Sequence, residues 1–312
     1  MLPIYAILLV LAFILIALVS GNNLSACSGS IISSKIVSRR SGIVITILGY
    51  ISGLLLEGGN FKGAISYLLP SGSGVVMVAF VTSILIFMYA HFRRVPQSLS
   101  LTFATAIIGI SVADRLAFNA AYVTAMLAFW VIAPFASVAL IIVSMRITRR
   151  LINKRDIWSS VGKIKILMIV MSFVTAFTLG ANTMGFVVTT LPQDYLSIGV
   201  MLAAIILGSA FLSAGELRRV GNEIIAIRYI NSINSQFTSA FLVEIATLLG
   251  IPLSNTQTFT SSVYGAGLSY KKRLMIKRPA MEIFTAWILM TIVSFLLAYG
   301  LTLALNMRLI LY

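Results

Sequence analysis

The chain reads LAFILIALVSGNNLS from Leu11 to Ser25, so a long apolar run meets a polar, glycine-containing segment at Ser20–Ser25. A second segment of this kind, GANTMG at Gly180–Gly185, interrupts the apolar run that starts near Ile164. Unpaired backbone N–H and C=O groups are costly in hydrocarbon, so a broken membrane helix survives only where protein or a wet cavity surrounds the break. Two matching breaks about 160 residues apart therefore predict a transporter built from repeats, with its binding site at the breaks.

The composition places the protein in a membrane. Its 312 residues are 59% hydrophobic and only 10% charged, whereas soluble domains carry about 25% charged residues. Apolar stretches recur along the whole chain, so we expect no separate soluble domain and a location in the cell membrane, in contact with lipid. The first apolar run lacks a basic n-region and a small-residue cleavage site, so it is expected to be a retained helix rather than a cleaved signal.

Charge and residue usage exclude several functions. The net charge of +15 does not point to nucleic acid, because lysines and arginines of multispanning proteins collect in cytoplasmic loops. With one cysteine, Cys27, and one histidine, His91, neither an intrachain disulfide, a cysteine-based metal cage nor a histidine relay can form. No aspartate-rich metal motif is present. We therefore expect no enzymatic activity and no cofactor or metal beyond a coupling ion.

The apolar segments predict an all-α polytopic membrane protein with about 10–12 membrane segments, since a spanning helix needs roughly 20 apolar residues. The first transmembrane repeat, residues 1–145, is expected to contain segments at 2–34, 42–56, 75–90, 96–112 and 117–145. After a basic cytoplasmic linker, residues 146–163, the second repeat, residues 164–312, is expected to contain segments at 164–192, 195–214, 237–250, 252–269 and 280–306. The segments that begin at Pro96 and Pro252 are short and are predicted to be half or re-entrant helices.

The basic residues predict that the two repeats are inverted. In the first half they lie at Lys35–Arg40 and Arg93–Arg94, and the matching positions of the second half carry none. The second half instead has basic residues at Arg218–Arg228 and Lys271–Arg278. With positive loops inside, this antiphase turns one half upside down relative to the other and places both termini outside. Chance scatter of the basic residues is the alternative.

Each half has a second polar segment that begins with proline: PQSLSL at Pro96–Leu101 and PLSNTQ at Pro252–Gln257. Proline suits the first turn of a helix, serine and threonine cap its amides, and the helix N-terminus attracts an oxyanion. Four helix ends that meet at the membrane midplane would replace the water shell of a tetrahedral oxyanion. The predicted substrate-binding residues are Asn22, Asn23, Ser25, Ser98, Ser100, Asn182, Thr183, Ser254, Asn255, Thr256 and Gln257. In the alternative interpretation, these side chains only pack or bond to their own helices.

These motifs resemble the inorganic phosphate transporter family of sodium–phosphate symporters and related permeases. Ser20–Asn23 and Gly180–Thr183 resemble the Gly-Ala-Asn-Asp motif that this family carries in each half. Pro96–Ser100 resembles its later Pro-x-Ser-Thr motif, and the best match is Gly250–Gln257 followed by Tyr264–Leu268. The resemblance covers nearly the whole chain. It implies a secondary transporter of two inverted repeats that moves inorganic phosphate by alternating access, coupled to Na⁺ or H⁺.

The chain departs from the family pattern on the cation side. Asn23 and Thr183 stand where the family has aspartates, which are implied in handling the coupling cation, so the choice between sodium and protons stays open. Glu57, where the family also tends to place a glutamate, and Glu244, inside an apolar segment, are the cation-coupling candidates.

Several alternatives remain open at the level of sequence. One branch of the family consists of sulfate permeases, so sulfate or another oxyanion is the second substrate candidate. An anion channel or a non-transporting regulatory paralogue would belong to another functional class. The oligomeric state is also open, and a homodimer is one assembly that the sequence allows.

Overall fold

The computed structural model describes residues 2–68, 72–93, 97–151, 157–213, 229–269 and 277–305, and these residues form helices but no strand. The helices of the first half are α1 (Leu2–Ser33), α2 (Arg39–Glu57), η1 (Gly58–Phe61), α3 (Lys62–Leu68), α4 (Ser73–Arg93), α5 (Leu99–Ala113) and α6 (Ala120–Leu151). Those of the second half are α7 (Ile157–Leu179), the π-helical turn η3 (Gly180–Met184), α8 (Gly185–Val188), α9 (Tyr195–Phe211), α11 (Tyr229–Leu248), α12 (Asn255–Ser269) and α13 (Lys277–Leu305). Each of the ten predicted apolar segments contains a helix, which confirms the all-α fold class.

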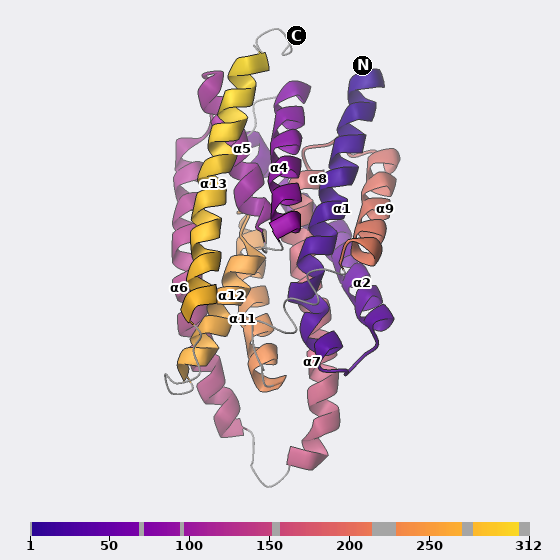
Figure 1. The fold of residues 1–312 in the computed structure, drawn as a ribbon, viewed down its shortest axis with the longest axis vertical. Helices are drawn as coiled ribbons and strands as arrows, with labels where there is room; N and C mark the ends of the chain where they lie inside the picture. Colours follow the sequence, from indigo (N-terminus) through magenta and orange to yellow (C-terminus); the bar gives the residue numbers. More distant parts are fainter. Residues whose placement is uncertain are drawn as a thin grey trace.

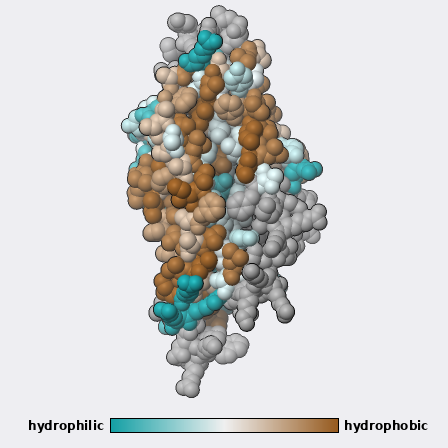
Figure 2. Space-filling model, turned by 90° about the vertical axis from the view of Figure 1, so that its left-hand side faces the viewer, coloured by the Kyte–Doolittle hydropathy of each residue, from teal (hydrophilic) through white to brown (hydrophobic). Residues whose placement is uncertain are grey.

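The outer surface of the bundle is suited to lipid. Within the described ranges, six helical runs are long and apolar enough to cross a membrane: Pro3–Ser33, Arg39–Leu68, Ser73–Arg93, Ala120–Arg150, Val161–Val188 and Trp287–Leu305. Large apolar side chains point outward, such as Phe135 of α6 and Ile288 of α13, which are 73% and 65% exposed. Figure 2 shows one face on which hydrophobic residues cover most of the surface between hydrophilic residues at its top and bottom. The chain is therefore a multi-pass membrane protein.

The main contacts between a helix of the first half and a helix of the second half have equivalent contacts with the two halves interchanged. α1 packs against α9 and α4, whereas α7, its counterpart, packs against α2 and α11. In the same way α5 packs against α13, and α12 packs against α6. In Figure 1, α1 and α6 run downward whereas α7 and α13 run upward, so that the start of α1 and the end of α13 lie opposite the end of α6 and the start of α7. These antiparallel counterparts are what an inverted repeat requires. The exact repeat bounds remain a prediction.

A close helix contact is also repeated in the two halves. Gly109 in α5 and Gly265 in α12 are each the thirteenth residue after the proline of their segment. A Cβ atom at Gly109 would lie 2.5 Å from the backbone oxygen of Phe295 in α13, and one at Gly265 would lie 3.0 Å from Cα of Val138 in α6. Glycine at both positions lets each short helix lie directly against the backbone of a long one.

The structure corrects the predicted break near Asn22. α1 is α-helical without interruption from Leu2 to Ser33, and the Gly180–Met184 segment is a single π-helical turn after which the chain continues as a helix. Asn22 and Asn182 need no broken backbone, because neighbouring segments supply their hydrogen-bond partners. The prediction of short helices is confirmed instead at α5 and α12, which have 15 residues each and are too short to span a bilayer.

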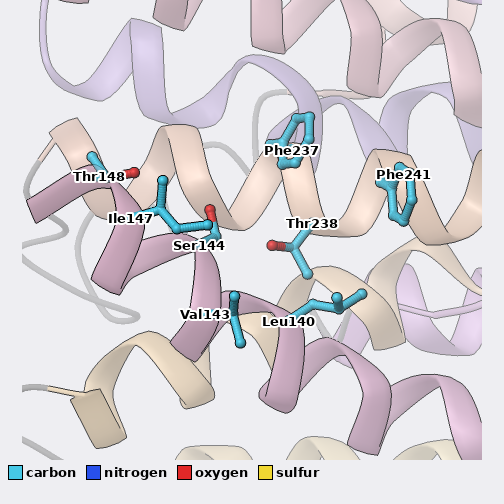
Figure 3. Close-up of a pocket in the computed structure, with 8 residues that line it drawn as sticks. All are labelled: Leu140, Val143, Ser144, Ile147, Thr148, Phe237, Thr238 and Phe241. Carbon is cyan, nitrogen blue, oxygen red and sulfur yellow. The ribbon is translucent and has the colours of Figure 1, made fainter. Parts of the chain in front are cut away.

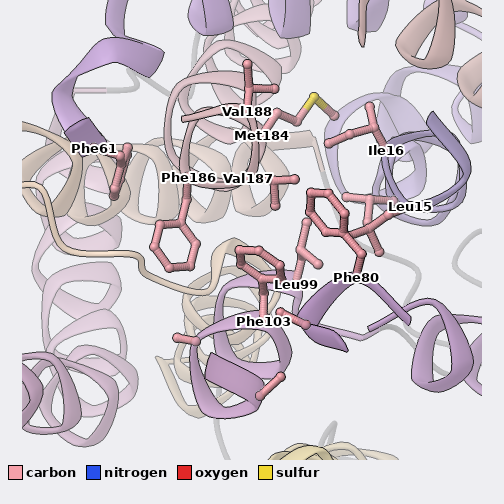
Figure 4. Packing of buried hydrophobic residues seen from close by; sticks show 14 of the residues in the cluster. Leu15, Ile16, Phe61, Phe80, Leu99, Phe103, Met184, Phe186, Val187 and Val188 are labelled. Carbon is pink, nitrogen blue, oxygen red and sulfur yellow. The ribbon is translucent and has the colours of Figure 1, made fainter. Parts of the chain in front are cut away.

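An aromatic cluster fills the core between η1, α4, α5 and α8. The rings of Phe80 and Phe103 stack with centroids 5.6 Å apart, and Phe103 meets Phe186 edge-on at 5.5 Å. Phe61 adds a tilted contact with Phe186 at 5.7 Å. Figure 4 shows these rings together with Leu15, Ile16 and Leu99. All four phenylalanines are fully buried.

Candidate functional site

One asparagine in each half binds the backbone just before a short helix. Asn182 Oδ1 accepts a hydrogen bond from the backbone N–H of Leu253 at 2.9 Å, and Asn22 Oδ1 accepts one from Gln97 at 3.4 Å. Leu253 and Gln97 are equivalent, since each directly follows the proline of its segment. Asn182 also donates through Nδ2 to Thr247 Oγ1 and Ile251 O. The two asparagines therefore hold the N-termini of α5 and α12 in place.

Each short helix begins three residues after the proline of its segment, so the prolines precede the helices and do not lie in their first turn as predicted; Pro96 itself lies outside the described residues. A serine caps each helix. Ser98 Oγ accepts from the N–H of Leu101 at 3.4 Å, and Ser254 Oγ accepts from that of Gln257 at 3.2 Å. Both caps leave the remaining amides of the first turn at the end of the helix, where the partial positive charge of the dipole is located. Each short helix therefore presents an anion-attracting end to the interior of the bundle.

The two N-termini meet. Ser100 Oγ of α5 donates to the backbone oxygen of Leu253, directly before α12, at 3.2 Å, although the two residues are 153 positions apart. The described side chains of the predicted site are all buried, less than a tenth exposed: Asn22, Asn23, Ser98, Ser100, Asn182, Thr183, Ser254, Asn255, Thr256 and Gln257. The side chain of Ser25 lies outside the described residues. A buried meeting point of two helix N-termini can hold an oxyanion in place of its water shell.

Several polar atoms at this point are buried without a partner among the described residues. They are the side-chain oxygens of Asn23, Gln97 and Gln257 and the amide nitrogen of Asn255. Buried polar groups in native proteins almost always bond to protein, water or a ligand, so these atoms are candidates to contact a substrate or ion. Gln97 was not among the predicted site residues, although its place directly after Pro96 could have indicated it.

The two predicted coupling carboxylates form a pair that joins the halves. Glu57 ends α2 and Glu244 lies in α11, and their side chains are within hydrogen-bond reach of each other. Oε2 of each is buried without a donor among the described residues. Two carboxyl groups can bond only if a proton lies between them. The part of the chain that the structure describes holds no cluster of three or more His, Cys, Asp or Glu side chains that could bind a metal.

A cavity of about 310 Å³ opens elsewhere, between α6 and α11. Its lining residues, shown in Figure 3, are Leu140, Val143, Ser144, Ile147, Thr148, Phe237, Thr238 and Phe241. The hydroxyls of Ser144 and Thr148 already donate to Asn234 Oδ1, and about half of Phe237 is exposed. This cavity is an apolar groove at the periphery and contains none of the predicted site residues.

The fold and the motifs match known proteins. Residues 158–298 match the model of the Phosphate transporter family. A putative phosphate permease of Methanocaldococcus jannaschii is 21% identical and aligns with 93% of this chain and 94% of its own. A probable low-affinity inorganic phosphate transporter of Bacillus subtilis is 21% identical and aligns with 83% of this chain and 84% of its own. A sulfate permease of the same organism is 24% identical and aligns with 86% of this chain and 78% of its own.

A solved structure, described as the sodium-dependent phosphate transporter, superimposes with a TM-score of 0.84 at 16% identity, over 98% of this chain and 99% of that one. The overall fold therefore follows a known transporter architecture. Together with the family match over the second half, these similarities confirm the resemblance that the motifs predicted. The second half of the chain is therefore similar to the phosphate transporter family, and nearly the whole chain shares the fold of that solved structure.

Proposed function

We propose that this protein is a secondary transporter that moves inorganic phosphate across the cell membrane by alternating access. The observation that carries the proposal is the buried meeting of the α5 and α12 N-termini, each held by an asparagine of its own half through Gln97 and Leu253. Such a site lies between two equivalent units, so a small rearrangement of one unit against the other changes the side from which it opens.

Polar atoms without partners favour phosphate over sulfate. The site offers helix-end N–H groups as donors, and the carbonyl oxygens of Asn23, Gln97 and Gln257 as acceptors. Hydrogen phosphate carries an O–H group at neutral pH and can donate to such an acceptor, whereas sulfate is fully ionised and cannot. A site with unfilled acceptors leaves buried groups unpaired when sulfate binds, which is costly. The similarity to a sulfate permease makes sulfate the second substrate to test.

The carboxyl pair Glu57–Glu244 supports proton coupling. It connects α2 of one half with α11 of the other, so loss of its shared proton would drive two like charges apart and change how the halves pack. Sodium also binds through oxygen atoms, and the carbonyl groups of Asn23 and Gln97 could coordinate it. Neutral oxygens hold a cation more weakly than the family's aspartates do, so protons are the coupling ion we favour.

The orientation follows from charge. Arg146, Arg149 and Arg150 are exposed at the end of α6 that leads into the α6–α7 connection. With positive segments inside, this end faces the cytoplasm and both termini face outward.

The proposal is tested by uptake of labelled phosphate and sulfate into proteoliposomes that contain Ser254→Ala or Gln257→Ala. We expect both variants to lose most phosphate uptake, because one removes the cap of α12 and the other an acceptor at the site. Ser52→Ala is the matched control, since the Ser52 hydroxyl bonds to Leu48 O and Gly49 O of its own helix. Normal uptake by both site variants would contradict the proposed site, and uptake of sulfate without phosphate would contradict the substrate.

A further inference from the structure

Buried polar side chains continue beyond the site along the contact between α11 and α12. Next to the start of α12, Ser239 Oγ donates to Asn255 Oδ1 at 2.5 Å and lies 2.7 Å from Thr258 Oγ1. Farther along, Ser262 Oγ donates to the backbone oxygen of Ser235 at 3.1 Å. These hydrogen bonds fix which faces of α11 and α12 meet. Residues three or four positions apart on one helix lie on the same face, so they line the same contact.

Several groups along this contact are buried without a partner among the described residues. They are the hydroxyls of Ser232, Ser235 and Ser261 and the side-chain oxygen of Gln236, all on side chains no more than 1% exposed. Gln236 is held by its other end, because Nε2 donates to Cys27 O of α1 at 2.8 Å. Buried hydroxyls that the protein leaves unpaired are normally satisfied by water or a ligand. We call Ser232, Ser235, Gln236, Ser239, Ser261 and Ser262 the α11–α12 seam.

The first half is more apolar at the positions equivalent to the seam. Counted from Pro96 instead of Pro252, the equivalents of Ser232, Ser235, Gln236 and Ser262 are Val76, Ala79, Phe80 and Ala106. All four are buried, and Phe80 belongs to the aromatic cluster of Figure 4, stacked on Phe103. The equivalents of Ser239 and Ser261 are polar, Ser83 and Thr105; Thr105 bonds to its own helix, and the Ser83 hydroxyl is buried without a partner among the described residues. The α11–α12 seam is therefore polar along its length, whereas the equivalent place in the first half is apolar at four of six positions.

We propose that the α11–α12 seam is the route by which the oxyanion passes between the central site and the end of the bundle that carries the α6–α7 connection. Figure 1 shows α11 and α12 in the part of the bundle toward that connection, and α4 and α5 in the part toward the chain ends. Hydroxyl and amide groups donate to an oxyanion and accept from its water, and without a positive charge they do not trap it. The stacked rings of Phe80 and Phe103 close the contact between α4 and α5 on the opposite side in this conformation. The identity of the oxyanion rests on the proposed function, whereas the route does not.

Single cysteines test the route, because Cys27 is the one native cysteine and Cys27→Ala gives a background without thiols. Ser235→Cys and Ser261→Cys are treated with a membrane-impermeant anionic thiol reagent, added from either side of oriented membranes. Ala79→Cys, at the position equivalent to Ser235, is the matched control. Gly162→Cys marks the connection side, since Gly162 is exposed in the first turns of α7 with nothing within 4 Å of a Cβ.

We expect the seam cysteines to react from the side that labels Gly162→Cys, at least about tenfold faster than Ala79→Cys, and phosphate to slow the reaction. If the seam cysteines react but phosphate does not slow the reaction, the result would support the route and count against phosphate as the transported substrate. Equal labelling of Ser235→Cys and Ala79→Cys in monodisperse protein would overturn the route. A second measurement does not depend on cysteine: Ser235→Ala is expected to lower the maximal uptake rate several-fold, and an unchanged rate would also overturn it.

Discussion

Asn182 and Leu253 are joined by a 2.9 Å hydrogen bond from the backbone N–H of Leu253 to the asparagine side chain. Asn182 lies in the π-helical turn η3, and Leu253 directly precedes α12. π-helical turns are rare and frequently occur at functional sites. The asparagine of the motif thus positions the short helix, whose end is the oxyanion site in the proposed function.

Asn182→Ala should therefore impair transport without removing a group that contacts substrate. It leaves the Leu253 N–H buried and unpaired, which costs about 1–3 kcal/mol, and we expect a lower melting temperature and a higher KM for phosphate uptake. Asn22→Ala should have a smaller effect, since its bond to Gln97 is longer, 3.4 Å. Asn119→Ala removes a cap at the exposed start of α6 and should leave the KM unchanged. An unchanged KM in Asn182→Ala would contradict the positioning role.

Glu244→Gln should uncouple transport from protons. The amide cannot release a proton, so uptake driven by a pH gradient should be lost, whereas exchange of external for internal phosphate, which needs no net proton movement, should persist. Glu57→Gln should behave alike, because the two carboxyls act as one pair. Asp194→Asn, at the start of α9, is the control acid. Full gradient-driven uptake in either pair variant would rule out this pair as the coupling site.

Gly53→Ala should destabilise the contact between the halves. A Cβ atom there would lie 1.9 Å from the backbone oxygen of Phe177 in α7, so the helices must separate, at a cost of about 1–3 kcal/mol. Gly59→Ala is the matched control, since nothing lies within 4 Å of its Cβ position. Thermal unfolding in detergent should show a lower melting temperature for the first variant only. Equal melting temperatures would mean that α2 and α7 do not pack this closely.

The cap of α9 should give a pH-dependent stability. The Tyr5 hydroxyl donates to Asp194 Oδ2 at 2.5 Å, and Ser197 N–H donates to Oδ1 at 2.7 Å. These bonds hold the pKa of the Asp194 carboxyl below its usual range. A lowered pKa stabilises the folded state above the unfolded pKa of about 4, and this stabilisation is lost as pH falls through the folded pKa.

Tyr5→Phe should accordingly lower the melting temperature slightly at pH 7, and the difference from the parent protein should vanish in strong acid. Asp194 is exposed, so the effect is expected to be small. A difference that grows as the pH falls would contradict the assigned cause.

The sequence predicted the helices better than their connections. Apolar runs located the ten segments, and the prolines at positions 96 and 252 located the starts of α5 and α12, because both signals are local. The break predicted near Asn22 was wrong, since the partner of this side chain is a backbone group 75 residues away. Long-range hydrogen bonds of this kind leave no local pattern.

The candidate site was predicted in part for the same reason. Polar residues that follow proline could be recognised, but the contact of Ser100 with Leu253 depends on how two halves pack across 153 residues. The seam along α11 was missed because its serines are spaced as in any polar helix face, and only their burial distinguishes them.

We propose that this protein carries phosphate through a site between its two halves and that protons drive the transport. The most direct measurement is uptake of labelled phosphate into proteoliposomes under an imposed pH gradient, compared with a sodium gradient and with labelled sulfate. We expect saturable phosphate uptake that is driven by the pH gradient. A sodium gradient should not replace the pH gradient, and excess sulfate should inhibit the uptake only slightly. Sulfate uptake without phosphate uptake, or no flux of either anion, would contradict the proposal.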